Sequence, residues 1–445
     1  MNRHSFLCNI ALILASVFTC NVQAEEANVA PKVSFSEQVA PILLKRCVSC
    51  HGSKLAESGY RLDSYRSLLS EMVSGQQAVV SGVIAESELF QRLIHEDADL
   101  RMPAEANSLP DAEIELIKNW IEQGAVYDGV SPDQILSSLL PSRRHPSAPE
   151  SYPASLPVSA IAIDLETKEI LTGGYHELII WNRSGQLLQR IGDQGQRTYS
   201  IDLHPTNRNI LTSSGTPGLL GEVRIFDRQT GQLIGNLIQS DEVILDAEYS
   251  PDGMRIAVAK PDGSIDLYDA NTNERILTLL GHSDQVTSVT WHSDGKRLGT
   301  TSRDKAAKIY DVDSGRSLAT FSGHTDCVNA LVFLDGDEVI TVSDDGTAMV
   351  WSAQNGRKKR DALSGQTPLL VVSRTEKHYR IGGTNRLLTY ELATHQKVAE
   401  LPTDGDWVTS VPEKEDSGML VFGLHSGEVR VAGGEKGIDQ FSAQP

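Results

Sequence analysis

The sequence predicts a multidomain protein in which a small all-α domain is followed by an all-β domain, a seven-bladed β-propeller. Three observations predict this arrangement. The chain has 445 residues, more than one hydrophobic core usually organises. A short helical pattern with two closely spaced cysteines occupies the first part, and an aromatic and acidic signature recurs about every 40 residues after residue 157. Between the two, residues 129–157 are rich in proline, serine and alanine, which marks a boundary.

Residues 1–24 are predicted to be a secretory signal peptide. Arg3 lies in a short basic start, an apolar run extends from Phe6 to Phe18, and Ala24 is the small residue expected before the cleavage site. The apolar run is shorter than the roughly 20 residues that cross a bilayer, so a retained anchor is the weaker interpretation. A lipoprotein signal at Cys20 would follow bulky residues that fit such processing poorly. We therefore expect a bacterial protein that is periplasmic or otherwise secreted, without a transmembrane anchor after cleavage.

The cysteine count narrows the chemistry of the first domain. Two of the five cysteines would leave with the signal peptide, and the mature chain keeps Cys47, Cys50 and Cys327. Three thiols cannot build a disulfide framework. In an oxidising compartment the close pair is a strained disulfide, a metal site or a haem attachment site, and His51 directly after it favours haem.

The segment Cys47-Val48-Ser49-Cys50-His51 has the spacing that a covalently attached haem needs. It follows residues 39–44, which are predicted to form a short helix with Pro41 near the first turn. Positions three and four apart share one face of a helix, so Cys47 and Cys50 can both reach the vinyl groups of one porphyrin, while His51 directs its imidazole at the iron. A zinc pair would need further ligands at comparable spacing, and a thioredoxin-like pair would need a βαβ setting. The sequence has neither.

Met102, followed by Pro103, is the best candidate for the sixth iron ligand. A thioether in that position would raise the reduction potential. The alternative for Met102 is a side chain that fills a gap in the core. The rival ligands are His95, which lies in an acidic exit from a helix where an exposed or capping role is favoured, and Met72, which follows the attachment helix closely.

The last helix of the domain is predicted from apolar residues at helical spacing, and it ends at Gly124. We expect a capped, amphipathic helix whose apolar face packs across the attachment helix, with Trp120 beside the haem. The apolar positions are Ile114, Ile117, Trp120 and Ile121.

Several segments together resemble the planctomycete-type cytochrome c family over about a fifth of the chain. They are Cys47 to His51, Tyr60 to Asp63, Ser81-Gly82, Glu86-Ser87, Arg101 to Pro103 and Leu116 to Ala125. The resemblance implies one covalent haem c in a domain over residues 33–128, with His51 and Met102 as iron ligands. Ser81 and Ala104 stand where many members have proline, and these departures concern loop stiffness rather than ligation.

The second domain, residues 158–445, is predicted from a repeat that follows the semi-rigid proline-rich linker at 129–157. The repeated signature occurs at Trp181-Asn182, Phe226-Asp227, Tyr268-Asp269, Tyr310-Asp311, Trp351-Ser352 and Tyr390-Glu391, in steps of 45, 42, 42, 41 and 39 residues. This period, with short alternating strands and Asp-Gly turns, is typical of propeller blades. A further unit begins at Trp407 without the signature, so we predict seven blades.

Two of the units resemble WD repeats. The first has Gly281-His282 with Ser302, Asp304 and Tyr310, and the second has Gly323-His324 with Ser343, Asp345 and Trp351. The resemblance implies a buried hydrogen-bond chain of His, Ser, Asp and aromatic side chains, which makes His282 and His324 structural. Cys327 is expected to be a small buried hydrophobe rather than a nucleophile.

The charge balance limits the function. Forty basic and 59 acidic residues give a net charge of −19, which opposes nucleic-acid binding and suits a positively charged redox partner protein. We expect a periplasmic mono-haem cytochrome that transfers electrons, with the propeller as a partner-docking platform. The alternatives are a haem-containing oxidoreductase with an active site in the propeller, and a haem-based sensor or scaffold with an open sixth position. Since the sequence carries no catalytic constellation, an electron-transfer or binding protein is favoured over a stand-alone enzyme.

Overall fold

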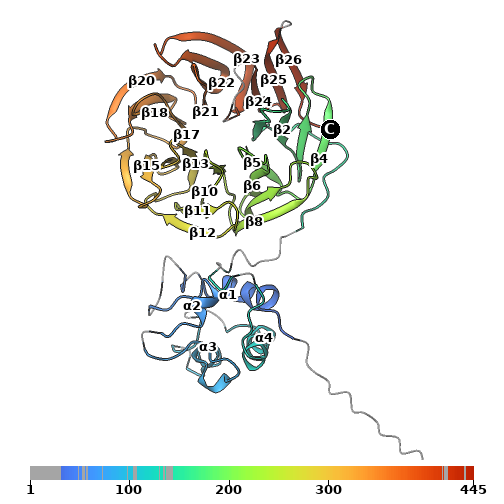
Figure 1. Cartoon of the computed structure of the whole chain (residues 1–445), viewed down its shortest axis with the longest axis vertical. Helices are drawn as coiled ribbons and strands as arrows, with labels where there is room; N and C mark the ends of the chain where they lie inside the picture. The colour runs from blue at the N-terminus through green and yellow to red at the C-terminus, as the bar shows by residue number, and fades with distance from the viewer. Residues whose placement is uncertain are drawn as a thin grey trace, which may run out of the picture.

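The computed structural model describes residues 32–445 except 49, 53–55, 57–58, 73, 98, 104–107, 130, 134–135, 137–143, 413, 415–418 and 435–436. The predicted signal peptide, residues 1–24, lies outside the described residues. Figure 1 shows a small helical part, coloured blue to cyan, beside a ring of β-sheets coloured green to red. Within the described ranges, no helix is both long and apolar enough to cross a membrane. A helical region followed by a β-propeller is the order that the sequence predicts.

The helical part consists of short helices. They are the π-helix η1 (Phe35–Val39), α1 (Ala40–Arg46), α2 (Tyr65–Leu68), the 3₁₀ helix η3 (Ile84–Glu86), α3 (Glu88–Leu93) and α4 (Asp111–Glu122). Pro41 lies in the first turn of α1, where a missing N–H is tolerated. Gly124 follows α4 with a φ of +99°, which glycine adopts without strain. The predicted side-chain cap of α4 is wrong, because Pro110 occupies the N-cap, and Asp111 and Glu113 instead place negative charge at this end.

One apolar core joins α1 to α4. Leu43 and Ile117 are fully buried, and Trp120 is 1% exposed. The Trp120 ring lies 5.1 Å from that of Phe35, and its indole N–H donates to the carbonyl of Val126 at 3.0 Å. The core therefore holds the end of α1, where the attachment motif begins, against the last helix of the domain.

Six antiparallel sheets form the ring, and five of them have four strands in chain order. The first two sheets contain β1 (Ile161–Ile163), β2 (Ile170–Gly173), β3 (Leu178–Trp181), β4 (Leu187–Ile191), β5 (Arg197–Leu203), β6 (Ile210–Thr216), β7 (Leu220–Phe226) and β8 (Leu233–Ser240). The next three contain β9 (Asp246–Tyr249), β10 (Arg255–Ala259), β11 (Ile265–Asp269), β12 (Arg275–Leu279), β13 (Val286–Trp291), β14 (Arg297–Ser302), β15 (Ala307–Asp311), β16 (Ser317–Phe321), β17 (Val328–Phe333), β18 (Glu338–Ser343), β19 (Thr347–Ser352) and β20 (Lys358–Ser364).

The sixth sheet has six strands, so the ring is assigned six sheets where the sequence predicts seven blades. It contains β21 (Leu369–Arg374), β22 (His378–Glu391), β23 (Lys397–Ser410), β24 (Leu420–Leu424), β25 (Glu428–Gly434) and β26 (Gly437–Ser442). The difference has a structural cause. β22 and β23 are each 14 residues long, and β23 pairs with β22 at one end and with β24 at the other.

The innermost strands surround a polar channel of about 200 Å³. Side chains on these strands bond to the next sheet around the ring: Thr287 Oγ1 donates to the Val328 carbonyl at 2.5 Å, and Asn329 Nδ2 donates to the Leu369 carbonyl at 2.8 Å. Ser410 Oγ closes the ring by donating to the carbonyl of Val158 at 2.6 Å. Apolar residues of the first and last sheets also share one cluster. The ring is therefore closed by side-chain packing and hydrogen bonds between its two ends.

Candidate functional site

The attachment motif forms the turn that directly continues α1. The Cys47 N–H donates to the Leu43 carbonyl at 2.9 Å, and the N–H groups of Cys50 and His51 donate to the Cys47 carbonyl at 3.2 and 3.0 Å. These helix-like bonds keep the backbone of residues 47, 50 and 51 within one turn. A two-bond ion pair between Arg46 and Glu113, with Nη2 to Oε1 at 3.0 Å, ties the turn to α4.

His51 is fixed by its neighbours on both sides of the residue. Its Nδ1 lies 3.3 Å from the carbonyl oxygen of Tyr60, and its own carbonyl accepts the N–H of Leu62 at 2.6 Å. Because a carbonyl oxygen can only accept, Nδ1 carries the proton in this bond, and Nε2 keeps the lone pair that binds a metal. Iron-ligating and zinc-ligating histidines are commonly oriented by such an outer hydrogen bond.

Cys47 and Cys50 are not joined by a disulfide, and their surroundings differ. Cys47 packs against the apolar core, whereas Cys50 is exposed. Burial raises the pKa of the Cys47 thiol to about 12, although the neighbouring Arg46 guanidinium acts in the opposite direction. The two cysteines thus lie at the edge of the core, with Cys47 packed against it and Cys50 exposed to solvent.

Gly52 is required by the close approach of the chain to itself. A Cβ at this position would lie 2.6 Å from the backbone oxygen of Val48, inside the attachment turn. We expect Gly52→Ala to distort the turn and to lower the fraction of chains that carry haem after periplasmic expression, with a loss of stability of about 1–3 kcal/mol. Haem content per protein and the thermal midpoint would measure it, with Gly192→Ala, where a Cβ meets nothing within 4 Å and the backbone φ is not positive, as the control. Unchanged haem content and midpoint in Gly52→Ala would contradict the expectation.

The three candidate axial ligands lie in different environments. Met102 is half-buried, and its N–H donates to the Arg92 carbonyl at 2.9 Å, which holds it beside the end of α3. The Nδ1 of His95 accepts the N–H of Asp97 at 3.1 Å, so one of its ring nitrogens is used in a hydrogen bond within the local turn. Met72 packs against the apolar core. Met102 is therefore the candidate whose side chain is engaged neither in a local turn nor in that core.

The residues present fit a covalently held haem. Two thiols lie on one turn at the edge of an apolar core, an oriented imidazole follows them, and a thioether is available from a second segment. A structural zinc site fits less well, because it needs about four Cys or His ligands. In the part of the chain that the structure describes, no three His, Cys, Asp or Glu residues are placed to hold a metal ion.

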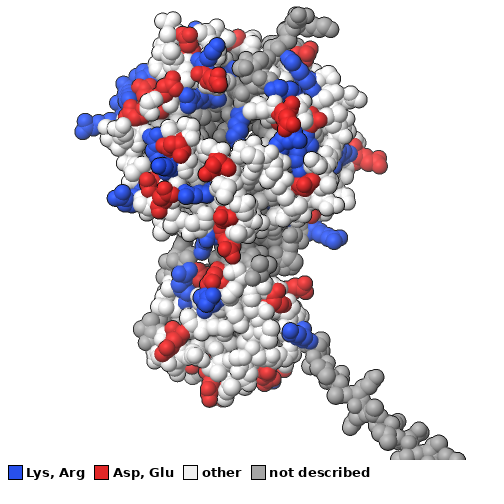
Figure 2. Space-filling model, viewed as in Figure 1, with Lys and Arg blue, Asp and Glu red and all other residues white. Residues whose placement is uncertain are grey.

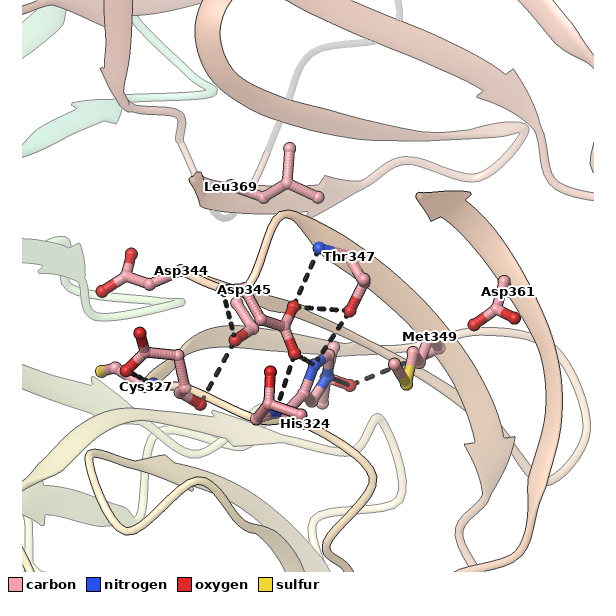
Figure 3. A network of polar contacts seen from close by, with 12 residues as sticks. His324, Cys327, Asp344, Asp345, Thr347, Met349, Asp361 and Leu369 are labelled. Atoms are coloured by element: carbon pink, nitrogen blue, oxygen red, sulfur yellow. Dashed lines mark hydrogen bonds and ion pairs between the residues drawn. The ribbon is translucent and has the colours of Figure 1, made fainter. Parts of the chain in front are cut away.

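The propeller contains two copies of one buried polar network, one of which is drawn in Figure 3. His324 Nδ1 lies 3.0 Å from Asp345 Oδ2, and its Nε2 lies 2.8 Å from Thr341 Oγ1. The second copy has His282 between Asp304 at 2.9 Å and Thr300 at 2.8 Å. Both imidazoles have side chains with no exposed area, and each is held on both nitrogens, so they stabilise the loops that join neighbouring sheets.

The serines join the two networks through the aspartates rather than through the histidines. Ser302 and Ser343 do not bond to the histidines: each accepts the N–H of the network aspartate, at 3.0 and 3.1 Å, and donates to a loop carbonyl. The sequence pattern missed the threonines at 300 and 341. They lie two residues before the serines, on the same side of an alternating strand, and this spacing was the available signal.

Cys327 also differs from expectation. It is half-buried rather than buried, and its thiol donates to Asn329 Oδ1 at 3.4 Å. Burial raises its pKa to about 11, so the weakly nucleophilic thiol form that the sequence suggests is favoured.

We expect the propeller to lose stability steeply as the pH falls from about 4 to 2. Burial acts to raise the pKa of Asp345, but hydrogen bonds from Thr347, backbone N–H groups and His324 outweigh it and lower the pKa to about 2. The pKa of Asp304 is also lowered. The unfolded chain takes up these protons near pH 3.8, well before the folded chain does, so acid favours unfolding in this window.

Thermal midpoints at half-unit steps from pH 7 to 2 would measure the effect. Above pH 4, groups of opposite sense partly cancel. Burial lowers the pKa of His282, His292, His324 and His395, which costs stability as the pH falls below 6.5, whereas burial raises the pKa of Asp246 to about 6, which acts in the opposite sense. A midpoint that stays flat between pH 4 and 2 would show that these carboxylates do not stabilise the fold.

Comparisons with known families agree with both parts of the chain. Residues 47–105 match the family described as Planctomycete cytochrome C. Residues 273–311 and 315–352 match the WD domain, G-beta repeat, and residues 220–291 match the Anaphase-promoting complex subunit 4 WD40 domain. No curated protein matches the sequence. The chain thus contains a segment similar to Planctomycete cytochrome C, followed by segments similar to WD-type repeats.

Proposed function

We propose that the helical domain holds one haem c through thioether bonds to Cys47 and Cys50 and that the protein transfers electrons. The observation that carries the proposal is the orientation of His51, whose Nδ1 faces the Tyr60 carbonyl at 3.3 Å and whose Nε2 keeps its lone pair. A histidine that lies beside two cysteines by chance has no need of a hydrogen bond that orients its ring. A histidine that binds iron needs this bond, because the ring must keep one orientation.

Met102 is the proposed second axial ligand. Two observations support this assignment. The backbone of Met102 is bonded to α3, and the other candidates make other contacts: His95 hydrogen-bonds within its own turn, and Met72 packs in the core. When bound, haem c supplies a one-electron couple whose potential a thioether ligand raises. The chain's own residues orient the imidazole, exclude water from the apolar side and close the sixth position against added ligands.

The charge of the domain supports a cationic redox partner. Residues 33–128 contain 15 acidic and 8 basic side chains, a net charge of −7. Figure 2 shows acidic residues over the lower end of this domain, whereas both signs are interspersed over the face of the propeller in view. Opposite charge steers the encounter of small electron carriers and weakens with added salt. We propose a periplasmic location, in keeping with the signal-like sequence of residues 1–24.

The propeller is proposed as a partner-docking platform with seven blades. Asn385 has a φ of +72° in the middle of β22, and β22 pairs with β21 before this point and with β23 after it. In β23, Asp404 and Gly405 have φ values of +53° and +93°. These turns divide each long strand into two, which makes eight strands for two blades. An experimental density map would count seven four-stranded units if the proposal holds and six sheets if it fails.

A redox cycle with carbon monoxide tests electron transfer against sensing. We expect the purified protein to accept one electron per chain, to return it to a chemical oxidant, and to bind no carbon monoxide in the reduced state, because the sixth position is filled. Uptake of carbon monoxide by the reduced protein at micromolar concentration would instead favour a sensor with an open position. A second redox-active absorption would favour an enzyme.

A further inference from the structure

The predicted linker, residues 129–157, is bound to both domains. Its first part belongs to the helical domain: Leu136 is fully buried in that core, and its N–H donates to the Asp63 carbonyl at 2.9 Å. The Arg66 N–H donates to the Pro132 carbonyl at 2.8 Å, and the Arg66 side chain pairs with Asp133. A free spacer would make no such contacts.

The last part of the linker is bound to the first sheet of the propeller. The hydroxyl of Tyr152 donates to Glu177 Oε1 at 2.5 Å and accepts the N–H of Tyr175 at 2.9 Å. The Arg190 guanidinium pairs with Glu177 Oε2 at 2.6 Å and donates to the Pro149 carbonyl at 2.5 Å. Glu177 is 1% exposed, so this anchor satisfies a buried carboxylate and is costly to open.

His145 makes a second anchor, on the second sheet. Its Nε2 lies 2.7 Å from Glu222 Oε1, and its backbone N–H donates to Asp193 Oδ1 at 2.8 Å. Glu222 is fully buried and lies 3.0 Å from Arg224, which is also fully buried, so His145 closes the outer end of a buried charged pair. The His145 ring stacks on that of His176 with centroids 5.9 Å apart. Figure 1 shows the segment running along the rim beside β4.

These anchors shorten the tether between the domains. From Leu136 to His145 there are nine peptide bonds, which span at most about 30 Å, whereas a linker over the whole of 129–157 would span about 100 Å. The short tether confines the helical domain to the neighbourhood of the first two sheets.

We propose that residues 145–152, here called the latch, lock the haem-binding domain beside the first two sheets of the propeller. The latch therefore fixes which part of the ring the haem domain can serve. If the protein transfers electrons as proposed above, a redox partner docked on the propeller exchanges electrons only when it lies near those sheets. The lock itself does not depend on that function.

Proteolysis of the full-length holoprotein tests the latch. Glutamyl endopeptidase cleaves after Glu150, whose carbonyl is held by Arg190. The variant His145→Ala/Tyr152→Phe removes the side-chain contacts of His145 and the hydroxyl of Tyr152, keeps the ring at position 152, and leaves the Glu222–Arg224 pair and the backbone bonds of the latch in place. We expect cleavage at Glu150 to become at least about tenfold faster, because the Tyr152 hydrogen bonds and the close contact of His145 with Glu222 are lost. His425→Ala, which changes an exposed histidine on the ring, should be cleaved like the unmodified chain.

Small-angle X-ray scattering of the same samples tests the placement of the domains. The double variant should have a larger maximum dimension than the unmodified protein, with an unchanged haem spectrum and a propeller that remains folded at the temperature of the measurement. Equal cleavage rates, or equal maximum dimensions, would overturn the latch. A missing haem spectrum in the unmodified protein would overturn the proposed function instead, and the scattering comparison would still decide the latch.

Discussion

A chain with Cys47→Ser and Cys50→Ser is expected to carry no covalent haem after periplasmic expression, while the propeller still folds. Serine keeps the size and turn geometry of these positions but cannot form thioether bonds. The change should be all or none, because both attachment atoms are removed and the remaining His51 and Met102 contacts are reversible. Intact-protein mass spectrometry measures it as the loss of one haem mass per chain.

The two single variants provide the control for this prediction. Cys50→Ser removes the exposed thiol and Cys47→Ser the packed one, so each should retain at most one thioether bond and reduced haem content. Cys327→Ser, in the propeller, should retain full haem content, because its thiol contacts Asn329 and no part of the helical domain is involved in that bond. Full haem content in the double variant would refute covalent attachment at this motif.

Replacing His324 by alanine is expected to destabilise the propeller by about 2–4 kcal/mol, the largest effect that we predict in the ring. The change removes the bonds to Asp345 and Thr341 and leaves the carboxylate of Asp345, with a side chain only 6% exposed, short of a partner. For a domain of this size the thermal midpoint should fall by roughly 3–7 °C. Differential scanning calorimetry of the holoprotein measures it.

His425→Ala is the matched control, because this histidine is exposed on the same ring. It should change the stability by less than about 0.5 kcal/mol. The equivalent change at His282 should act like His324→Ala, since the two networks have the same contacts within 0.1 Å. If His324→Ala and the unmodified protein had the same thermal midpoint, the network would have no structural role.

The sequence predicts the local features of the helical domain well, because they depend on near neighbours. Pro41 at the start of α1 and Gly124 after α4 act through backbone geometry that their residue type dictates. The residue pattern could not predict the orientation of the His51 ring. Its hydrogen-bond partner is the backbone carbonyl of Tyr60, which a residue of any type could supply.

The propeller shows where spacing misleads. The repeat period locates the strands, but it does not show that β21 to β26 would join in one six-stranded sheet, which depends on pairing between distant segments. The composition of residues 129–157 predicts a linker, yet Tyr152 and His145 bind buried carboxylates on strands and loops that lie far along the chain. Tyr152, an aromatic residue amid proline and serine, was the one signal of that contact.

The most direct test of the account is the visible spectrum of the oxidised protein beside that of Met102→Ala. The account predicts a single covalent haem c with the weak sulfur-to-iron charge-transfer band at about 695 nm, and loss of that band in Met102→Ala with the haem retained. A band that survives in Met102→Ala would remove Met102 from the iron. A protein expressed with haem available and purified without any haem would contradict the central claim that Cys47, Cys50 and His51 hold one.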